Sequence, residues 1–302
     1  MNRTKSFLVA AGFALALALM CSACSEGSEP KKALVGQWDT MESSVARDLI
    51  SDNVEFLNDG TGMMEASNLK GVGAYAEVFT WKIDNDGRLI LMSPTGAASI
   101  YSIVEISKSA LILEGNVAGI GHIRTTYSKR QTITDSRDNK KYRVVKIGEQ
   151  TWMAENLNIE IGNSACYDNK PENCQKYGRL YDWETALKAC PKGWHLPSDE
   201  EWMALVNFAG GDKVAGKKLK ARSGWNKAGY RDGNGEGLFG FSALPGGVGN
   251  GTNFNHVGNA GYWWSSSEYG NDLAYYRYMS IENDSWDYGN KPVLFSIRCL
   301  QD

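Results

Sequence analysis

The stretch CPKGWHLPSDEEW, residues 190–202, contains side chains used in nucleophilic, metal and acid–base chemistry. Cys190 carries a thiol, His195 an imidazole, and Asp199 and Glu200 carry adjacent carboxylates. A metal centre needs several ligands at suitable spacing, yet the chain has three histidines, and no CxxC pair lies near His195. A packed or capping imidazole is therefore favoured over a metal ligand, and we expect no metal centre here.

The preceding segment, YDWETALKAC, predicts a short helix. Asp182 can cap its start by accepting from free backbone N–H groups, and Pro191 and Gly193 follow its end. One face of this helix carries the apolar positions i, i+3, i+4 and i+7, namely Trp183, Ala186, Leu187 and Cys190. The thiol of Cys190 is thus expected on the buried stripe.

A second helix is predicted from Ser198. Ser198 and Glu201 have the spacing of a capping box, so Asp199 and Glu200 fall in the first turn, where acids favour the helix dipole. Its apolar face comprises Trp202, Leu205, Val206 and Ala209. This arrangement favours a structural role over a catalytic carboxylate pair, so residues 190–202 are interpreted as scaffold.

Four cysteines lie in the second half of the chain: Cys166, Cys174, Cys190 and Cys299. In an exported protein an even number favours disulfides, and spacing alone leaves three pairings open. The final segment KPVLFSIRCL predicts a strand with Phe295, Ile297 and Cys299 on one face, so Cys299 can meet Cys190 in the core. That bridge would contribute about 4.7 kcal/mol, and a local Cys166–Cys174 bridge about 2.6 kcal/mol, in the chain-entropy description.

The N-terminus has the pattern of a secretory signal, residues 1–23, with a basic flank and an apolar run too short to span a bilayer. Ser22-Ala23-Cys24 resembles a bacterial lipobox, which implies lipidation at Cys24; Cys21 is a poorer second candidate. We expect a membrane-anchored lipoprotein of the bacterial cell envelope, most simply of the outer membrane. Residues 24–33 are then expected to form an extended tether. The acidic residues at its start suggest export of the protein to the cell surface.

The charge balance argues against a nucleic-acid partner. The formal net charge is −3, and removing Arg3 and Lys5 with the signal segment makes it −5. No basic stripe accompanies it, so nucleic acid is not expected as a ligand.

Residues 34–130 predict an antiparallel β-meander that closes into a small barrel. Asp59-Gly60 and Asp86-Gly87 have the composition of hairpin turns. Gly36 and Trp38 resemble the Gly-x-Trp start of lipocalin-like domains, in which a basic residue of the last strand covers the tryptophan; Arg124 and Arg130 are the candidates. The segment is short for a lipocalin, which favours a barrel filled by its own side chains.

Residues 131–302 closely resemble the Fibrobacter succinogenes major paralogous (FISUMP) domain. The similarity rests on TDSRDNKKYRVVKIGEQTWMAENLN, the cysteine-rich segment through residue 202, GFSALPGG, and GYWWSSSEY with the segments that follow it. The order of helices, loops and final strand is similar to the C-type-lectin-like fold, in which a helix cysteine pairs with one in the last strand. The resemblance implies an α+β domain on an exported, often lipidated bacterial protein, with no settled activity.

The region from Gly224 to Tyr288 is rich in aromatic and amide side chains, which suit a recognition surface for a glycan or a protein and a role in adhesion. The candidate ligand-binding residues are Trp225, Tyr230, Trp264, Tyr269, Trp286 and Tyr288.

Calcium is a weak cofactor hypothesis for the same region. Asp232, Asn234 and Glu236 alternate as in an EF-hand loop, but Ala243 stands where the final acid is required. Glu282, Asn283 and Asp284 resemble a lectin motif loosely.

Two other functions remain open. A structural envelope protein without a small ligand is one. An oxidase like the formylglycine-generating enzymes, which share the C-type-lectin-like fold, is the other, and it would need free cysteines. Since GxSxG, HExxH and Walker patterns are absent and the four cysteines can pair, we expect no enzyme and no catalytic residues.

Overall fold

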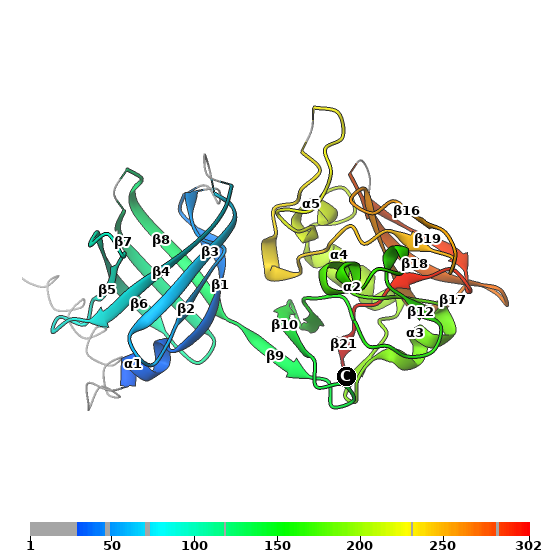
Figure 1. Ribbon diagram of the computed structural model, residues 1–302, viewed down its shortest axis with the longest axis horizontal. Helices are drawn as coiled ribbons and strands as arrows, with labels where there is room; N and C mark the ends of the chain where they lie inside the picture. The colour runs from blue at the N-terminus through cyan, green and yellow to red at the C-terminus, as the bar shows by residue number, and fades with distance from the viewer. Residues whose placement is uncertain (1–28, 46–48, 70–72, 118, 231, 282–283) are drawn as a thin grey trace, which may run out of the picture.

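The computed structural model describes residues 29–302 except 46–48, 70–72, 118, 231 and 282–283. The predicted signal segment and the lipidation candidate Cys24 therefore lie outside the described residues. Two domains stand side by side, a barrel and a larger mixed domain (Figure 1). No helix of the described part combines the length and apolarity needed to cross a membrane.

The first domain is a closed barrel in which each strand pairs antiparallel with the next in sequence. β1 also pairs with β8, Trp38 opposite Lys129, and so closes it. At the turn after β2, Gly60 has a φ of 84° and Asp59 Oδ1 accepts from Thr61 N at 2.8 Å, as expected for an Asp-Gly hairpin turn. The strands are β1 (Gly36–Ser43), β2 (Asn53–Phe56), β3 (Thr61–Leu69), β4 (Gly73–Ile83), β5 (Leu89–Met92), β6 (Ala98–Ile106), β7 (Ala110–Val117) and β8 (Gly121–Lys129).

Large side chains of the barrel's own strands pack in its interior. Phe56 contacts Phe79 and Trp81 edge to face, with ring centroids 5.7 and 5.4 Å apart. A helix, α1 (Glu29–Leu34), lies at one end, where the sequence predicted an extended tether. Leu34 is fully buried, and its carbonyl accepts from Trp38 Nε1 at 2.7 Å, so this segment completes the barrel core.

The cation that covers Trp38 is Lys129, not Arg124 or Arg130. Lys129 Nζ lies 5.1 Å from the ring centroid of Trp38, its cross-strand partner. Arg124 pairs with Glu114 on β7, and Arg130 pairs with Asp39. The sequence prediction was wrong by one residue for Arg130, because cross-strand pairing selects the residue directly opposite.

The second domain contains two main sheets and a small ribbon, with strand orders β14-β21-β11-β10-β9, β12-β13-β20-β17-β18-β19 and β15-β16. The first sheet comprises β9 (Gln131–Thr134), β10 (Lys141–Ile147), β11 (Gln150–Met153), β14 (Trp194–His195) and β21 (Leu300–Gln301). The second comprises β12 (Ser164–Ala165), β13 (Leu180–Tyr181), β17 (Ala260–Glu268), β18 (Leu273–Ser280), β19 (Asp284–Asn290) and β20 (Phe295–Ser296).

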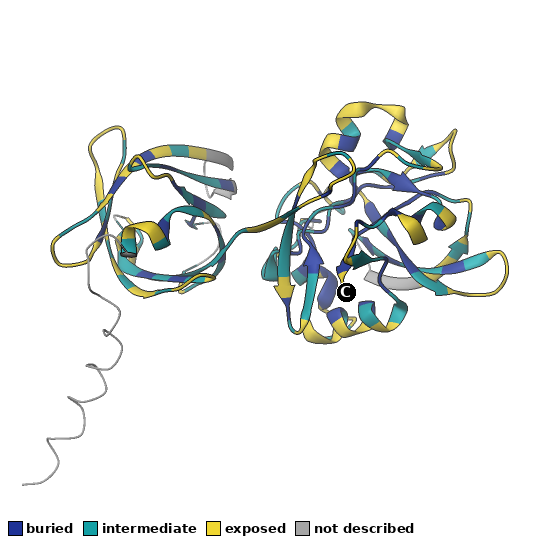
Figure 2. Ribbon diagram, turned by 90° about the horizontal axis from the view of Figure 1, so that it is seen from below, coloured by how far each residue is buried: buried dark blue, intermediate teal, exposed yellow. Residues whose placement is uncertain are grey.

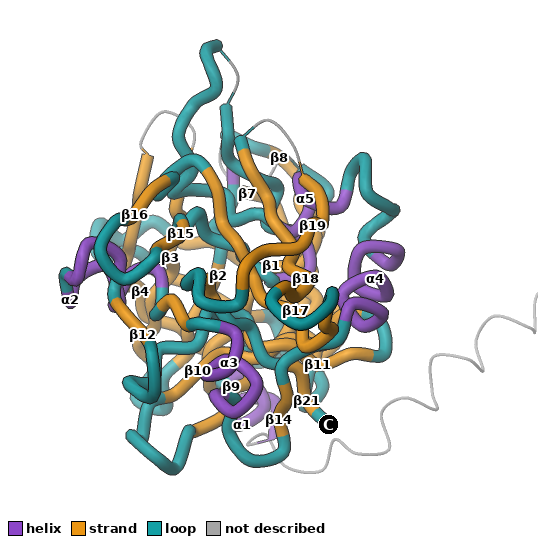
Figure 3. The backbone as a smooth tube through the Cα atoms, turned by 90° about the vertical axis from the view of Figure 1, so that its right-hand side faces the viewer, coloured by secondary structure: helices purple, strands orange, loops and turns teal. Residues whose placement is uncertain are grey.

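Loops make up most of the chain between α4 and β17 (Figure 3). The ribbon strands are β15 (Val248–Gly249) and β16 (Phe254–Asn255). The helices of this domain are η2 (Tyr167–Asn169), α2 (Pro171–Tyr177), α3 (Trp183–Ala189), α4 (Asp199–Phe208), α5 (Ala215–Leu219) and η3 (Leu238–Gly240).

Both predicted helix starts are confirmed. Asp182 caps α3 by accepting from Thr185 N at 2.9 Å, and Ser198 and Glu201 form the reciprocal capping box of α4. The buried stripe of α3 is Trp183, Ala186 and Ala189, whereas Leu187 is 39% exposed. The prediction for Leu187 was wrong because α3 is only seven residues long and turns a narrow face to the core.

The two predicted disulfides are present. Cys190 at the end of α3 is bonded to the fully buried Cys299, and Cys166 is bonded to Cys174 of α2. The first bond joins residues 109 positions apart and ties α3 to the segment leading into β21. It lies within a core cluster with Trp183, Trp264 and Phe295.

One residue, Arg130, separates the last barrel strand from β9 of the second domain (Figures 1 and 2). Its backbone N–H donates to Gln37 O at 2.7 Å, and its guanidinium bonds Asp39 and Gln37 Oε1. A second link joins Asp52 of the barrel to Arg222 by an ion pair. The joint between the domains is therefore short and held from two sides.

Candidate functional site

The six aromatic residues singled out from the sequence have different environments. Trp225 is 5% exposed, and its Nε1 donates to Ala243 O at 3.0 Å. Trp264 is fully buried and donates to Tyr181 O at 2.8 Å. Both rings pack in the core, where no face is open to a ligand.

Tyr230 and Trp286 belong to other segments of this domain. Tyr230 is fully exposed in the loop region. Trp286 belongs to β19, opposite Arg277 of β18, and only its backbone is described.

Tyr269 and Tyr288, together with Tyr275, form an exposed cluster that we call the tyrosine platform. Tyr275 of β18 pairs directly with Tyr288 of β19. The ring of Tyr269 stacks on that of Tyr288 with centroids 4.2 Å apart and an interplanar angle of 18°, and lies 5.3 Å from Tyr275 edge to face. Tyr269 and Tyr288 are 45% and 44% exposed, so ring surface faces solvent.

The hairpin between β17 and β18 holds this platform. Tyr269 N donates to Leu273 O at 2.9 Å, which closes the turn. Lys291 reaches it from beyond β19, with Nζ 2.7 Å from Glu268 Oε1 and 2.8 Å from Asn271 O. Exposed polar residues adjoin Tyr269 in the chain, namely Glu268, Asn271 and Asp272. Stacked rings beside hydrogen-bonding groups suit a ligand with both an apolar face and hydroxyl groups.

The opposite face of the same hairpin carries tyrosines that the sequence analysis did not select. Tyr262 pairs with Tyr278 across β17 and β18, the rings stacked 5.9 Å apart, and His256 Nδ1 lies 2.8 Å from the Tyr262 hydroxyl. Burial, with a smaller effect of Asp287, raises the pKa of Tyr276 to about 12. Burial also raises the pKa of Tyr262. The alternation of these tyrosines along the strands was the available sequence signal.

The candidate calcium ligands have other contacts. Asn234 Oδ1 accepts from Trp225 N at 3.0 Å, Asp232 Oδ1 accepts from Asn234 N at 3.1 Å, and Glu236 pairs with Lys217 at 3.4 Å. Glu282 and Asn283 lie outside the described residues, and only the backbone of Asp284 is described. Within the described ranges no three His, Cys, Asp or Glu side chains gather as a metal centre would require.

The acid–base residues of the opening stretch bind other protein groups. Asp199 pairs with the buried Arg277 at 2.6 Å. His195 Nδ1 lies 2.8 Å from Asp302 Oδ1, and its Nε2 lies 3.0 Å from both carboxylate oxygens of Glu201. His195 thus links the start of α4 to the end of β21.

We predict that His195 titrates above its ordinary value. Partial burial lowers its pKa, but the hydrogen bonds and charges of Asp302 and Glu201 outweigh burial and raise it. The protonated ring therefore stabilises the fold fully below about pH 6.5, and this contribution is lost as pH rises through the higher folded-state pKa. NMR titration should show the raised pKa, and Glu201→Gln should lower it. An unchanged pKa in that variant would contradict the assignment.

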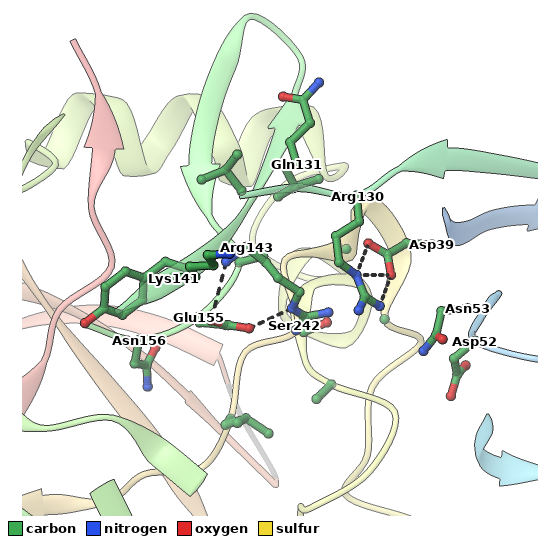
Figure 4. A pocket seen from close by; sticks show the side chains of 18 of the residues that line it. Asp39, Asp52, Asn53, Arg130, Gln131, Lys141, Arg143, Glu155, Asn156 and Ser242 are labelled. Atoms are coloured by element: carbon green, nitrogen blue, oxygen red, sulfur yellow. Dashed lines mark hydrogen bonds and ion pairs between the residues drawn. The ribbon is translucent and has the colours of Figure 1, made fainter. Parts of the chain in front are cut away.

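A large cavity lies elsewhere, between the two domains. It has a volume of about 990 Å³ and is lined from both sides (Figure 4). We call it the interdomain cleft. Its lining groups come from segments far apart in sequence, which is why sequence analysis did not bring them together.

Taken together, the fold defines a two-domain protein in which a closed barrel precedes a disulfide-bonded α+β domain. The second domain matches the family model of the Fibrobacter succinogenes major domain over residues 145–301, just over half of the chain. The chain belongs to this family. The match begins within β10, later than the resemblance at residue 131 seen in the sequence.

Solved structures of bovine odorant binding protein are similar to part of the chain. The complex with a selenium-containing odorant has 14% identity, a TM-score of 0.26, and covers 37% of this chain and 80% of that chain. The complex with undecanal has 15% identity and a TM-score of 0.26, covering 38% and 79%. At such low identity and TM-score, this similarity supports no conclusion beyond the barrel topology already described. A search of curated proteins found no match.

Proposed function

We propose that this chain is a lipid-anchored, non-catalytic recognition protein of the bacterial cell envelope whose second domain binds glycans at the tyrosine platform. The observation that carries the proposal is the stacked pair Tyr269 and Tyr288, held by a hairpin with nearly half of each residue exposed. Aromatic rings of this kind supply contact area at low conformational cost.

The fold supports a C-type-lectin-like assignment for that domain. A cysteine at the end of α3 is bonded to one beside the last strand, and long loops separate α4 from the hairpin of β17 and β18. This order is the one that the resemblance implies. The paired cysteines also favour binding over a copper-dependent oxidase chemistry, which would need free thiols.

Anchoring by a lipid at Cys24 is part of the proposal. The lipobox-like Ser22-Ala23-Cys24 and the apolar run before it support it. Two or more acyl chains would hold the protein stably, since each buried methylene contributes about 0.8 kcal/mol. Mass spectrometry of the mature N-terminal peptide should find a diacylglyceryl cysteine at residue 24. An unmodified cysteine at this position would contradict the proposed lipid anchor.

A glycan array with the full-length protein in detergent tests recognition, run with and without a calcium chelator. We expect binding to a subset of sugars and a loss of roughly tenfold or more in affinity for Tyr269→Ala/Tyr288→Ala, since each 1.4 kcal/mol is a factor of ten. Loss of binding with chelator alone would add a calcium requirement.

Tyr230→Ala is the matched control, because it removes an exposed tyrosine of the loop between α5 and η3, outside the tyrosine platform, and should leave binding unchanged. Near-UV circular dichroism checks that the double variant is folded. Blank arrays, while a cell-surface pulldown retrieves a protein partner, would discard the sugar assignment, and equal binding by the double variant would discard the platform.

A further inference from the structure

The interdomain cleft is built jointly by the barrel and the second domain. β1 and β8 line it from the barrel; β10, residues 154–158, α2 and residues 221–223 line it from the second domain (Figure 4). Its volume of about 990 Å³ is at the upper end of the range for ligand sites, roughly 300–1,000 Å³.

Every carboxylate that lines the cleft is paired with an arginine that also lines it. Arg130 bonds Asp39, and Arg222 bonds Asp52. Arg143 Nε lies 2.8 Å from Glu155 Oε1. Each of these ion pairs is neutral as a whole and connects two segments that line the cleft.

The remaining charged groups of the lining are lysines: Lys129, Lys140, Lys141, Lys146 and Lys176. Lys140 and Lys146 pair with Asp138 and Glu149, which lie outside the lining, at 3.2 and 3.5 Å. Lys141 and Lys176 are exposed, and neither has a carboxylate within ion-pair distance among the described residues. The whole chain carries a net charge of −3, so the excess of positive charge in the cleft arises from where the lysines lie in the fold and not from the composition of the chain. Clefts lined by one sign of charge concentrate ligands of the other.

A buried cation adds to this field from behind the wall. Arg298 is fully buried, and within the described part of the chain it has no carboxylate at ion-pair distance. Its Nη2 donates to Asn156 Oδ1 at 2.9 Å, and Nη1 donates to Phe241 O. Burial lowers the pKa of Arg298 to about 9, which leaves it charged at neutral pH. Asn156 lines the cleft, so the charge lies directly beneath the surface.

From this arrangement we propose that the interdomain cleft binds an acidic oligosaccharide, one bearing carboxylate or sulfate groups. The lysines bind the anionic groups, and other amides of the lining offer donors and acceptors for hydroxyls: Asn53, Gln131, Asn158 and Gln175. This site is independent of the tyrosine platform.

Calorimetry on the full-length protein in detergent tests it with oligogalacturonate, a heparin tetrasaccharide, neutral cellotetraose and inorganic sulfate. At least one of the two acidic oligosaccharides should bind, more weakly as salt rises, and cellotetraose should not bind at the cleft. Lys141→Gln/Lys176→Gln should weaken binding about fivefold or more. Lys192→Gln/Lys213→Gln makes the same charge change at exposed lysines outside the cleft and should have no effect.

Three results would overturn the proposal: no binding of either acidic oligosaccharide, equal weakening by both double variants, or inorganic sulfate binding as tightly as the oligosaccharides. Tyr269→Ala/Tyr288→Ala should leave acidic binding intact, so failure of the platform and failure of the cleft are distinguishable.

Discussion

Replacing both Cys190 and Cys299 by alanine should lower the free energy of unfolding by about 4–5 kcal/mol. The bond closes a loop of 109 residues, so its loss returns a large loop entropy to the unfolded chain. It also removes a link at the fully buried Cys299 beside Trp183 and Phe295. Urea unfolding followed by tryptophan fluorescence measures the change.

Cys166→Ala/Cys174→Ala is the matched control, since its loop spans only eight positions and should account for about 2.6 kcal/mol. The order of the two losses is the informative result. A larger loss from the short loop would show that local strain or packing, rather than loop closure, decides the contribution of these bonds.

Asn156→Ala should cost about 3–5 kcal/mol, because Asn156 satisfies two buried donors with one oxygen. Its Oδ1 accepts from Trp263 Nε1 at 2.8 Å and from Arg298 Nη2 at 2.9 Å. Its Nδ2 donates to Tyr177 O at 2.9 Å. Alanine would leave a buried cation without its main acceptor, and an unsatisfied buried charge is among the most destabilising changes.

A double-mutant cycle with Arg298→Met isolates that cause. Methionine removes the buried charge, so Asn156→Ala should be less destabilising in that background by about 1–3 kcal/mol. Additive losses would instead assign the effect to the cavity left by Asn156. Thermal or urea unfolding of the four proteins decides between the two.

Several structural features could be predicted from sequence because their causes are local. The caps of α3 and α4 depend on Asp182, Ser198 and Glu201, each within three residues of its partner. The Asp-Gly turn at Gly60 needs only the residues of that turn. The pairing of Cys190 with Cys299 is not local: it was inferred from an expected helix face and a single expected final strand. The structure confirms the bond but divides that segment into β20 and β21, with Cys299 between them.

The exposure of individual aromatic residues could not be predicted in this way. Trp264 and Tyr269 lie five residues apart in similar surroundings of sequence, yet one is fully buried and the other 45% exposed. The difference arises because Phe295 and Tyr181 pack against Trp264, while the hairpin carries Tyr269 past the edge of that core. Leu187 was predicted to be buried, but tertiary packing again decides its exposure, because the short helix α3 buries only Trp183, Ala186 and Ala189.

The sequence by itself determined the order of elements, the helix starts and the hairpin turns, since short-range geometry and residue type govern these. Only the tertiary structure brought Lys141 and Lys176 of the second domain opposite the barrel, and Arg298 beneath Asn156. Such neighbours are set by how two packed domains meet at Arg130 and by the ion pair of Asp52 with Arg222. Contacts between segments distant in sequence carry no local pattern, and for this reason the cleft emerged only from the folded chain.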